Sequence, residues 1–181
     1  MSYLGALSIR DGANLDAFSR LRASSPGFVF DAQFTYNLLP FRVEMVTSGT
    51  GATIAHDPTN RCAKLDFAAT PNGGTAYAQT YEFFRYQPGR SQLIFAGFNF
   101  RAKVASVTKF VGYSDGINGV EFFVVGTGSL SFRILSATTA GNQVVAQASW
   151  NLDKLDGTGA SGHNLDITKN QLLVIDMQAA G

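Results

Sequence analysis

The sequence predicts an all-β protein, and three observations support that prediction. From about Phe28 to Met177, short apolar segments with alternating character recur roughly every 8 to 14 residues, the spacing of a sandwich or barrel. Glycine- and proline-containing turns separate them. The chain also holds 15 Phe and 6 Tyr against one Trp, and such side chains fit the inner face of a pleated sheet. We therefore expect an antiparallel β-sandwich, jelly-roll or lectin-like, with an extended N-terminal arm.

Length, charge and cysteine content narrow the class of protein. A chain of 181 residues can form one domain that buries about 70% of its unfolded surface. Its 14 basic and 13 acidic residues nearly balance, which argues against nucleic acid or an anionic membrane as a partner. Cys62 has no second cysteine to pair with. No window of the sequence approaches a membrane span. The expected organisation is an arm over residues 1–26 and a sandwich domain over residues 27–181.

The first 26 residues differ from the rest because no clear strand occurs there. Asn14 can cap a short helix through DAFSRLR, and Pro26 would end the segment. One such turn cannot build a core by itself. We expect this arm to pack on another subunit through its apolar and basic side chains, which are Leu4, Leu7, Ile9, Leu15, Phe18, Arg20, Leu21 and Arg22.

Six segments before residue 105 have the composition of strands. The first has mixed alternation, which indicates a bulge or bend near Asp31. Turn sequences, such as residues 48–51 and 57–60, separate the segments. The six segments are FVFDAQFTYN, RVEMVT, ATIAH, RCAKLDF, AYAQTYEFFRY and SQLIFAGFNFRA.

The central part predicts an antiparallel meander of three strands, over residues 107–113, 119–125 and 130–137. NQVVAQASW follows, then a loop over residues 153–163, and QLLVIDMQ closes the fold. About ten to twelve strands result, which suits two stacked sheets with helix content below about 10%. The predicted core residues occupy the alternate positions of their strands that we expect to face inward. They are Phe95, Phe122, Val124, Leu130, Phe132, Ile134, Val145, Leu173 and Ile175.

The loop NLDKLDGTGASGHNLD is the best candidate for a cation site in the sequence. Asp153, Asp156 and Asp166 provide oxygen atoms of the kind that calcium prefers. Their spacing does not match an EF-hand loop, and aspartates in glycine-rich loops commonly accept hydrogen bonds from turn amides. The second interpretation is favoured, so we expect no metal and no cofactor.

No arrangement of side chains in the sequence indicates catalysis. A glycosidase needs two carboxylates across a cleft, yet no two of the three glutamates share a short motif, and Glu121 alternates away from the face of Phe122. His56 and His163 lie in turn regions without a catalytic partner at a known spacing. We therefore expect a protein that is not an enzyme. A glycan hydrolase is kept as a third alternative only because lectin-like sandwiches sometimes carry that chemistry.

Three tyrosines are candidate contacts for a sugar, because aromatic rings stack on pyranose faces. They are Tyr77, Tyr81 and Tyr86, with Gln79 and Arg85 beside them. Packing in the core or in a subunit interface is the alternative use of these rings, and it is the favoured one.

Three stretches of the chain resemble a group of tailed-bacteriophage virion proteins. Members of that group begin with an Asp-Ala-Phe-x-Arg-Leu-Arg motif and a Phe-Asp before a tyrosine. The stretches are DAFSRLRASSPGFVFDAQFTYN, YEFFRYQPGRSQLIFAGFNF and WNLDKLDGTGASGHNLDITKNQLLVIDMQ.

The resemblance implies a structural component of the particle, in the tail, a fibre or the head surface. It implies that the chain is located in the virion after synthesis in the host cytoplasm, and that its partners are other virion proteins. A homo-oligomer is expected, with a trimer as one arrangement. The alternative is a carbohydrate-binding module on the tail that recognises a host surface glycan.

Overall fold

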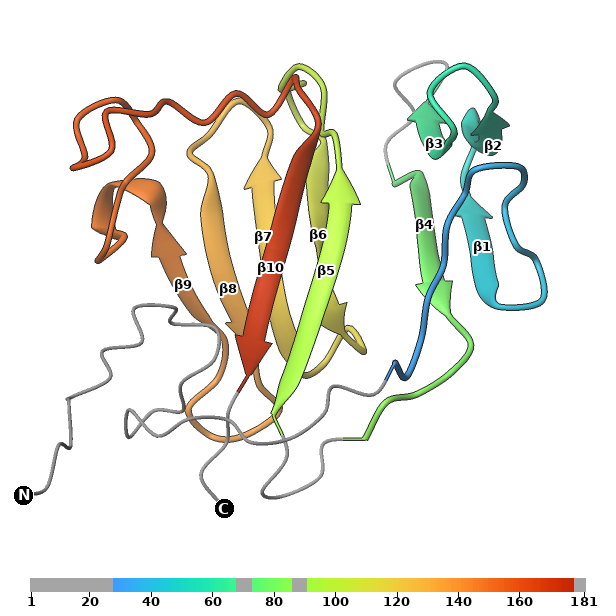
Figure 1. The fold of residues 1–181 in the computed structure, drawn as a ribbon, viewed down its shortest axis with the longest axis horizontal. Helices are drawn as coiled ribbons and strands as arrows, with labels where there is room; N and C mark the ends of the chain where they lie inside the picture. The colour runs from blue at the N-terminus through green and yellow to red at the C-terminus, as the bar shows by residue number, and fades with distance from the viewer. Residues whose placement is uncertain (1–27, 68–72, 86–90, 178–181) are drawn as a thin grey trace, which may run out of the picture. The chain divides into compact units, whose positions relative to one another are not determined.

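The structure, a computed structural model, describes residues 28–67, 73–85 and 91–177, and this part of the chain is all-β (Figure 1). It contains ten strands, all paired antiparallel, and one 3-10 turn, η2 (Gln147–Ser149). The predicted fold class is thereby confirmed, while the jelly-roll or lectin-like type stays a prediction. The predicted arm and its helix lie outside the described residues.

The described part of the chain divides into two compact units, one before residue 86 and one after residue 87. The β1–β4 unit comprises the described residues up to 85, and the β5–β10 unit comprises residues 91–177. Each unit is described by itself below. A single domain over residues 27–181 stays a prediction.

The β1–β4 unit consists of two antiparallel pairs. β1 (Val43–Ser48) pairs with β4 (Thr75–Thr80), and β2 (Ala52–Asp57) pairs with β3 (Cys62–Phe67). The tight turn between β2 and β3 forms because the Asp57 carboxylate accepts hydrogen bonds from the amides of Thr59 (2.9 Å) and Asn60 (3.0 Å).

The strand predicted for FVFDAQFTYN is wrong, since residues 28–42 form turns and bends. Side chains hold this segment in place of a backbone ladder. The Arg42 guanidinium donates to the carbonyl of Asp31 (2.7 Å) and lies over the ring of Phe30 (4.6 Å to the centroid). His56 Nε2 donates to the carbonyl of Phe34 (2.9 Å). The mixed alternation of this stretch was therefore the sign of an irregular segment rather than of a bulged strand.

The β5–β10 unit contains two antiparallel sheets. One pairs β5 (Gln92–Phe98) with β10 (Gln171–Met177), and the other is a meander of four strands. The meander confirms the predicted one to within about two residues at each end. Its strands are β6 (Thr108–Ser114), β7 (Gly119–Val125), β8 (Ser131–Leu135) and β9 (Gln143–Ala146).

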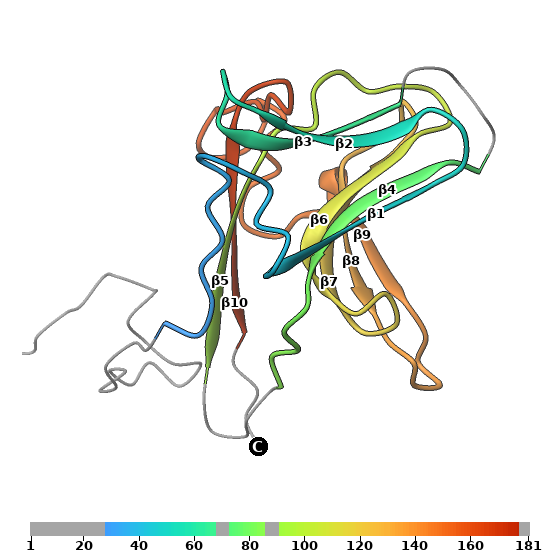
Figure 2. The same cartoon turned by 90° about the vertical axis from the view of Figure 1, so that its right-hand side faces the viewer.

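The two sheets of this unit face each other over an aromatic core, and Figure 2 shows them nearly edge-on. Phe122 stands at its centre, with ring centroids 5.6 Å from Phe98, 5.6 Å from Phe100 and 5.1 Å from Phe132. The buried apolar residues of the cluster are Phe100, Phe122, Val124, Leu130, Ile167, Leu173 and Ile175. Five of the predicted core residues are thus confirmed, and Phe132 packs against them partly buried.

Three predicted core residues are exposed, for two different reasons. Phe95 is 61% exposed because its strand has the opposite phase, with Ile94 and Ala96 packed against the core. Ile134 and Val145 do lie on the core face of their sheet, since they pair with Val120 and Phe132. They are nevertheless 53% and 44% exposed. Figure 1 shows why: β5 and β10 lie in front of β6 and β7, and no described strand covers β8 and β9.

Candidate binding cleft

The incomplete cover of the meander leaves a cleft of about 640 Å³ in the β5–β10 unit. It lies between the start of β10, the core face of β8 and β9, and the segment that follows η2. Its walls are mainly apolar, and they include Phe98, Phe122, Phe132, Val145, Trp150 and Leu173. A concave, apolar site with a few polar groups at its rim is the usual form of a binding site.

Trp150, the one tryptophan of the chain, forms part of the cleft wall. Its ring lies against Phe132 (5.2 Å between centroids) and near Phe122 (6.3 Å). Its indole N–H donates a long hydrogen bond of 3.4 Å to the carbonyl of Val145. The indole is thus held between the core and the cleft, so its fluorescence would report what enters the cleft.

Gln147 fixes the segment that forms the outer rim of the cleft. Its backbone amide donates to the carbonyl of Leu130 (2.9 Å), which ties η2 to the meander. Its side-chain amide donates to the carbonyls of Lys154 (2.9 Å) and Leu155 (3.0 Å). Gln147 therefore ties the rim to the sheet through both its side chain and its backbone amide.

The aspartates of the neighbouring loop serve loop amides, as the favoured interpretation predicted. Asp153 accepts hydrogen bonds from the amides of Leu155 (2.8 Å) and Ser161 (2.7 Å). Gly159 leaves room for this arrangement, because a Cβ there would lie 2.2 Å from Asp153 Oδ1. The hydrogen bonds from Leu155 and Ser161 lower the pKa of Asp153.

Two further aspartates repeat the pattern on a smaller scale. Asp156 accepts hydrogen bonds from the hydroxyl and the amide of Thr158, and Asp166 does the same with Thr168. These bonds lower the pKa of both carboxyls. Within residues 28–67, 73–85 and 91–177, no group of three or more His, Cys, Asp and Glu side chains is placed to hold a metal ion.

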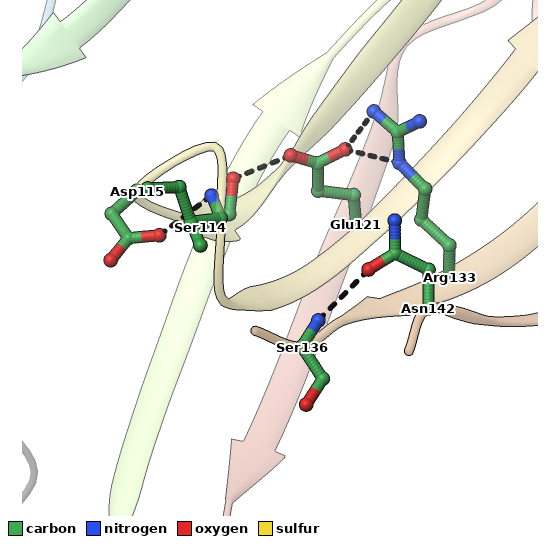
Figure 3. A network of polar contacts seen from close by, with 7 residues as sticks. Ser114, Asp115, Glu121, Arg133, Ser136 and Asn142 are labelled. Atoms are coloured by element: carbon green, nitrogen blue, oxygen red, sulfur yellow. Dashed lines mark hydrogen bonds and ion pairs between the residues drawn. The ribbon is translucent and has the colours of Figure 1, made fainter. Parts of the chain in front are cut away.

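A buried ion pair lies on the opposite face of the meander, and Figure 3 shows it from close by. Glu121 is 2% exposed, and both of its oxygens are engaged. Ser114 donates to Oε1 (2.5 Å), while Arg133 Nε donates to Oε2 (2.6 Å). The Arg133 guanidinium also lies over the ring of Phe123 (4.8 Å to the centroid). A buried carboxylate whose two oxygens are both engaged in this way orders the sheet.

Gly112 explains how a glutamate fits at that position. It pairs directly with Glu121, and a Cβ at Gly112 would lie 2.7 Å from Glu121 Cα and 3.1 Å from its Cγ. The sequence correctly predicted that Glu121 points away from the face of Phe122. It did not reveal Arg133 as the partner, which the pairing of β7 with β8 places opposite Glu121.

The structure describes two of the three candidate sugar-contacting tyrosines, both in the β1–β4 unit. Tyr77 on β4 is half-buried, and Tyr81 is exposed just beyond the end of that strand. The amide of Tyr81 donates to the carbonyl of Arg42 (3.1 Å), so the alternation continues and both rings lie on one face with Gln79. Tyr86 lies outside the described residues, as do all eight predicted arm contacts.

Comparison of the chain with protein-family models, with curated proteins and with solved structures gives no match. Among the residues that the structure describes, no helix is both long and apolar enough to cross a membrane. Proposals about function therefore rest on the side chains of this protein and on the resemblance described above.

Proposed function

We propose that this chain is a non-enzymatic structural or adaptor component of a phage particle, acting through protein–protein assembly in the tail or on the head surface. One observation carries the proposal. The two-stranded sheet formed by β5 and β10 carries four large apolar side chains on its outer face, each between 47% and 64% exposed: Leu93, Phe95, Leu172 and Val174. These four residues are called the outer patch below.

The register shows that the outer patch is continuous. Phe95 pairs with Val174, and Leu172 pairs with Gly97, whose missing side chain leaves open space beside it. Leu93 pairs with Asp176, the one charged residue of the outer face of these two strands. An antiparallel sheet with one face in water normally carries polar residues on that face. A sheet that is apolar on both faces indicates burial on both, and an exposed apolar patch of this kind marks an interaction site.

Two further features support assembly rather than catalysis. Both oxygens of the buried carboxylate Glu121 are engaged by Ser114 and Arg133, which is the arrangement of a structural ion pair. The loop aspartates are committed to loop amides in the same way. The resemblance to phage virion proteins points to the particle as the place of assembly, with further copies of the chain and other virion proteins as partners.

The proposal can be tested by locating the tagged chain in purified particles of the phage or prophage that encodes it. We expect it to co-purify with particles through a density gradient and to label the tail or head surface in electron micrographs. Phe95→Asp should prevent incorporation, whereas Thr127→Asp, at an exposed turn of the same unit, should not. Particles that lack the wild-type chain would contradict the proposal.

A glycan-binding module on the tail is the second candidate, and one observation favours it. Tyr77, Gln79 and Tyr81 share one face of the β1–β4 sheet, with Gln79 hydrogen-bonded to Glu44 (2.5 Å). Two rings flanking an amide are a form of sugar-binding surface. Reproducible low-micromolar binding to one sugar class on a glycan array, lost in Tyr81→Ala, would favour this candidate over assembly alone.

A further inference from the structure

Half of the basic residues in the β5–β10 unit lie in and just after the connection between β5 and β6. Residues 91–177 contain six lysines and arginines, and Arg101, Lys103 and Lys109 are three of them. The segment from 101 to 109 contains no aspartate or glutamate. None of the three side chains forms an ion pair within the described residues. These three residues are called the cationic cluster below.

Backbone carbonyls, rather than carboxylates, position the two ammonium groups of the cluster. Lys109 Nζ donates to the carbonyls of Phe100 (2.6 Å) and Ala102 (2.7 Å). Lys103 Nζ donates to the carbonyl of Gly128 (2.7 Å), in the turn between β7 and β8. A carbonyl satisfies a donor without carrying a full negative charge, and an ammonium has three donors. Both side chains are therefore held in place while their positive charges are not neutralised.

Arg101 combines a strained backbone with an exposed side chain. Its φ of 56° lies in the left-handed region, which favours glycine. Its amide donates to Asn99 Oδ1 (2.8 Å), but its guanidinium makes no hydrogen bond or ion pair with the described residues. Burial and the charge of Arg101 lower the pKa of Lys109, whose ammonium lies between the carbonyls on either side of Arg101. Backbone strain of this kind is concentrated at residues that contact a ligand.

The cationic cluster begins at one end of the sheet that carries the outer patch. Gly97, which pairs with Leu172 of the patch, precedes Arg101 by four residues, so their Cα atoms lie at most about 15 Å apart. Asn99, between them, donates to the carbonyl of Thr168 (3.1 Å), just before β10. Figure 1 shows the connection to β6 leaving the end of the sheet at which β10 begins. An apolar centre with polar groups at its rim is the usual composition of a protein interface.

We propose that the outer patch and the cationic cluster together bind an acidic segment of another virion protein. Apolar side chains of that segment pack on the patch, and its carboxylates meet the cluster at the rim. The guanidinium of Arg101 presents a planar fork that matches a carboxylate, and Lys103 and Lys109 add further donors. The inference rests on the proposed function, whose partner it describes chemically.

The size of the cluster favours a protein partner over a nucleic acid. Proteins that bind duplex DNA through its backbone commonly contact about six to ten phosphates. Three positive charges beside an apolar patch suit a short segment that carries both carboxylates and apolar side chains.

A short synthetic peptide that alternates leucine and glutamate is the probe. Its binding to the purified full chain is followed by the fluorescence anisotropy of a rhodamine label. We expect saturable binding that weakens as sodium chloride rises from about 0.05 M to about 0.5 M, because salt screens exposed charges. The matched peptide that alternates leucine and glutamine should bind about tenfold more weakly. Equal binding of the two peptides would overturn the acidic partner.

Arg101→Gly separates binding from folding. Glycine adopts the left-handed backbone without strain, so the thermal midpoint of unfolding should stay the same or rise. The affinity for the leucine–glutamate peptide should nevertheless fall about tenfold. The matched control is Lys154→Ala, which removes one exposed positive charge from the same unit and should leave the affinity unchanged. Equal affinities of these two variants would overturn the role of Arg101.

Exchange of the charges tests the chemistry of the contact. The double variant Arg101→Glu and Lys103→Glu should lose binding to the leucine–glutamate peptide and bind a leucine–lysine peptide instead. A short oligothymidylate tests phosphate groups as the ligand. Tighter binding of this oligonucleotide than of the leucine–glutamate peptide to the wild-type chain would overturn an acidic protein segment as the partner.

The two proposals fail in different ways. Absence of the chain from particles would overturn the virion function while leaving peptide binding intact. Failure of the wild-type chain to bind the leucine–glutamate peptide would overturn the acidic partner and leave the location in the particle to its own test.

Discussion

The two units of this protein are built from the same kinds of strand and turn, yet only one has a core. In the β5–β10 unit one sheet covers another, and seven apolar side chains are buried together. In the described part of the β1–β4 unit, Val43 is the one buried apolar residue. Three large side chains there are at least 90% exposed, namely Phe28, Tyr36 and Phe41.

The difference shows that turn sequences are sufficient to form hairpins in both units, whereas a buried core also requires a second sheet to pack against. The Asp57 carboxylate closes the β2–β3 turn as the Asp115 carboxylate closes the β6–β7 turn, each by accepting two backbone amides. Both hairpins therefore form from local sequence. Isolated two-stranded hairpins are marginally stable at best, and a second layer is needed to bury an apolar face. We expect the β1–β4 unit to gain stability from partners, and the β5–β10 unit to hold itself.

The largest expected effect comes from removing the central ring of the core. Phe122→Ala should lower the free energy of unfolding by about 3–5 kcal/mol, since it removes a buried ring and leaves a cavity. Phe41→Ala, its counterpart in the β1–β4 unit, should change it by no more than about 0.5 kcal/mol. Urea unfolding followed by circular dichroism, which reports the strands of both units, measures both. Equal losses would break the contrast between the units.

The next effect concerns ion pairs. Glu121→Ala leaves the Arg133 guanidinium beside an empty site, and we expect a loss of about 2–3 kcal/mol, below the range for a fully buried pair because the Arg133 side chain is partly exposed. Adding Arg133→Met should recover part of this loss. Glu44→Ala, which breaks the exposed contact with Gln79, should cost less than about 1 kcal/mol. Thermal unfolding of all four proteins gives the comparison.

Acid should loosen the loop that forms the cleft rim. Hydrogen bonds hold the pKa of Asp153, Asp156 and Asp166 below the ordinary value of 3.8. A lowered folded-state pKa contributes stability above the unfolded value, and this contribution is lost as the pH falls through the folded value. The protection factors of the Leu155 and Ser161 amides, which correct the exchange rate for its intrinsic pH dependence, should therefore fall below about pH 4. In Asp153→Asn that pH dependence should disappear, and its persistence would contradict the assignment.

The sequence predicted best what short-range chemistry determines. The meander from Thr108 to Leu135 was predicted from alternation and its turns, and the aspartates of residues 153–166 from their preference for loop amides. Phe95 was misplaced because β5 is apolar on both faces, so alternation does not set its phase. Ile134 and Val145 have the correct phase and are exposed all the same, since the extent of the opposing sheet is a long-range property.

The candidate cleft was missed for the same reason. It forms where Val145 on β9 and Trp150 just after η2 meet Leu173 on β10, which lies further along the chain. A single tryptophan at the end of a predicted strand was a signal that sequence reasoning passed over. The ring of Trp150 contacts that of Phe132 because the chain turns at η2. The strand predicted for NQVVAQASW extended across this turn and so did not predict the contact.

The smallest expected effect on stability is that of deleting residues 2–25. If the β5–β10 unit holds itself, this deletion should change its free energy of unfolding by less than about 1 kcal/mol, because the described residues of the buried cluster all lie between 100 and 175. The same deletion should abolish incorporation into particles, since it removes the apolar side chains predicted to contact a neighbour. Chemical unfolding by Trp150 fluorescence and the density-gradient assay measure the two effects separately. A truncated chain that fails to fold as a monomer would place the arm in the core of its own domain. The β5–β10 unit would then not be stable by itself, and the contrast with the β1–β4 unit would be wrong.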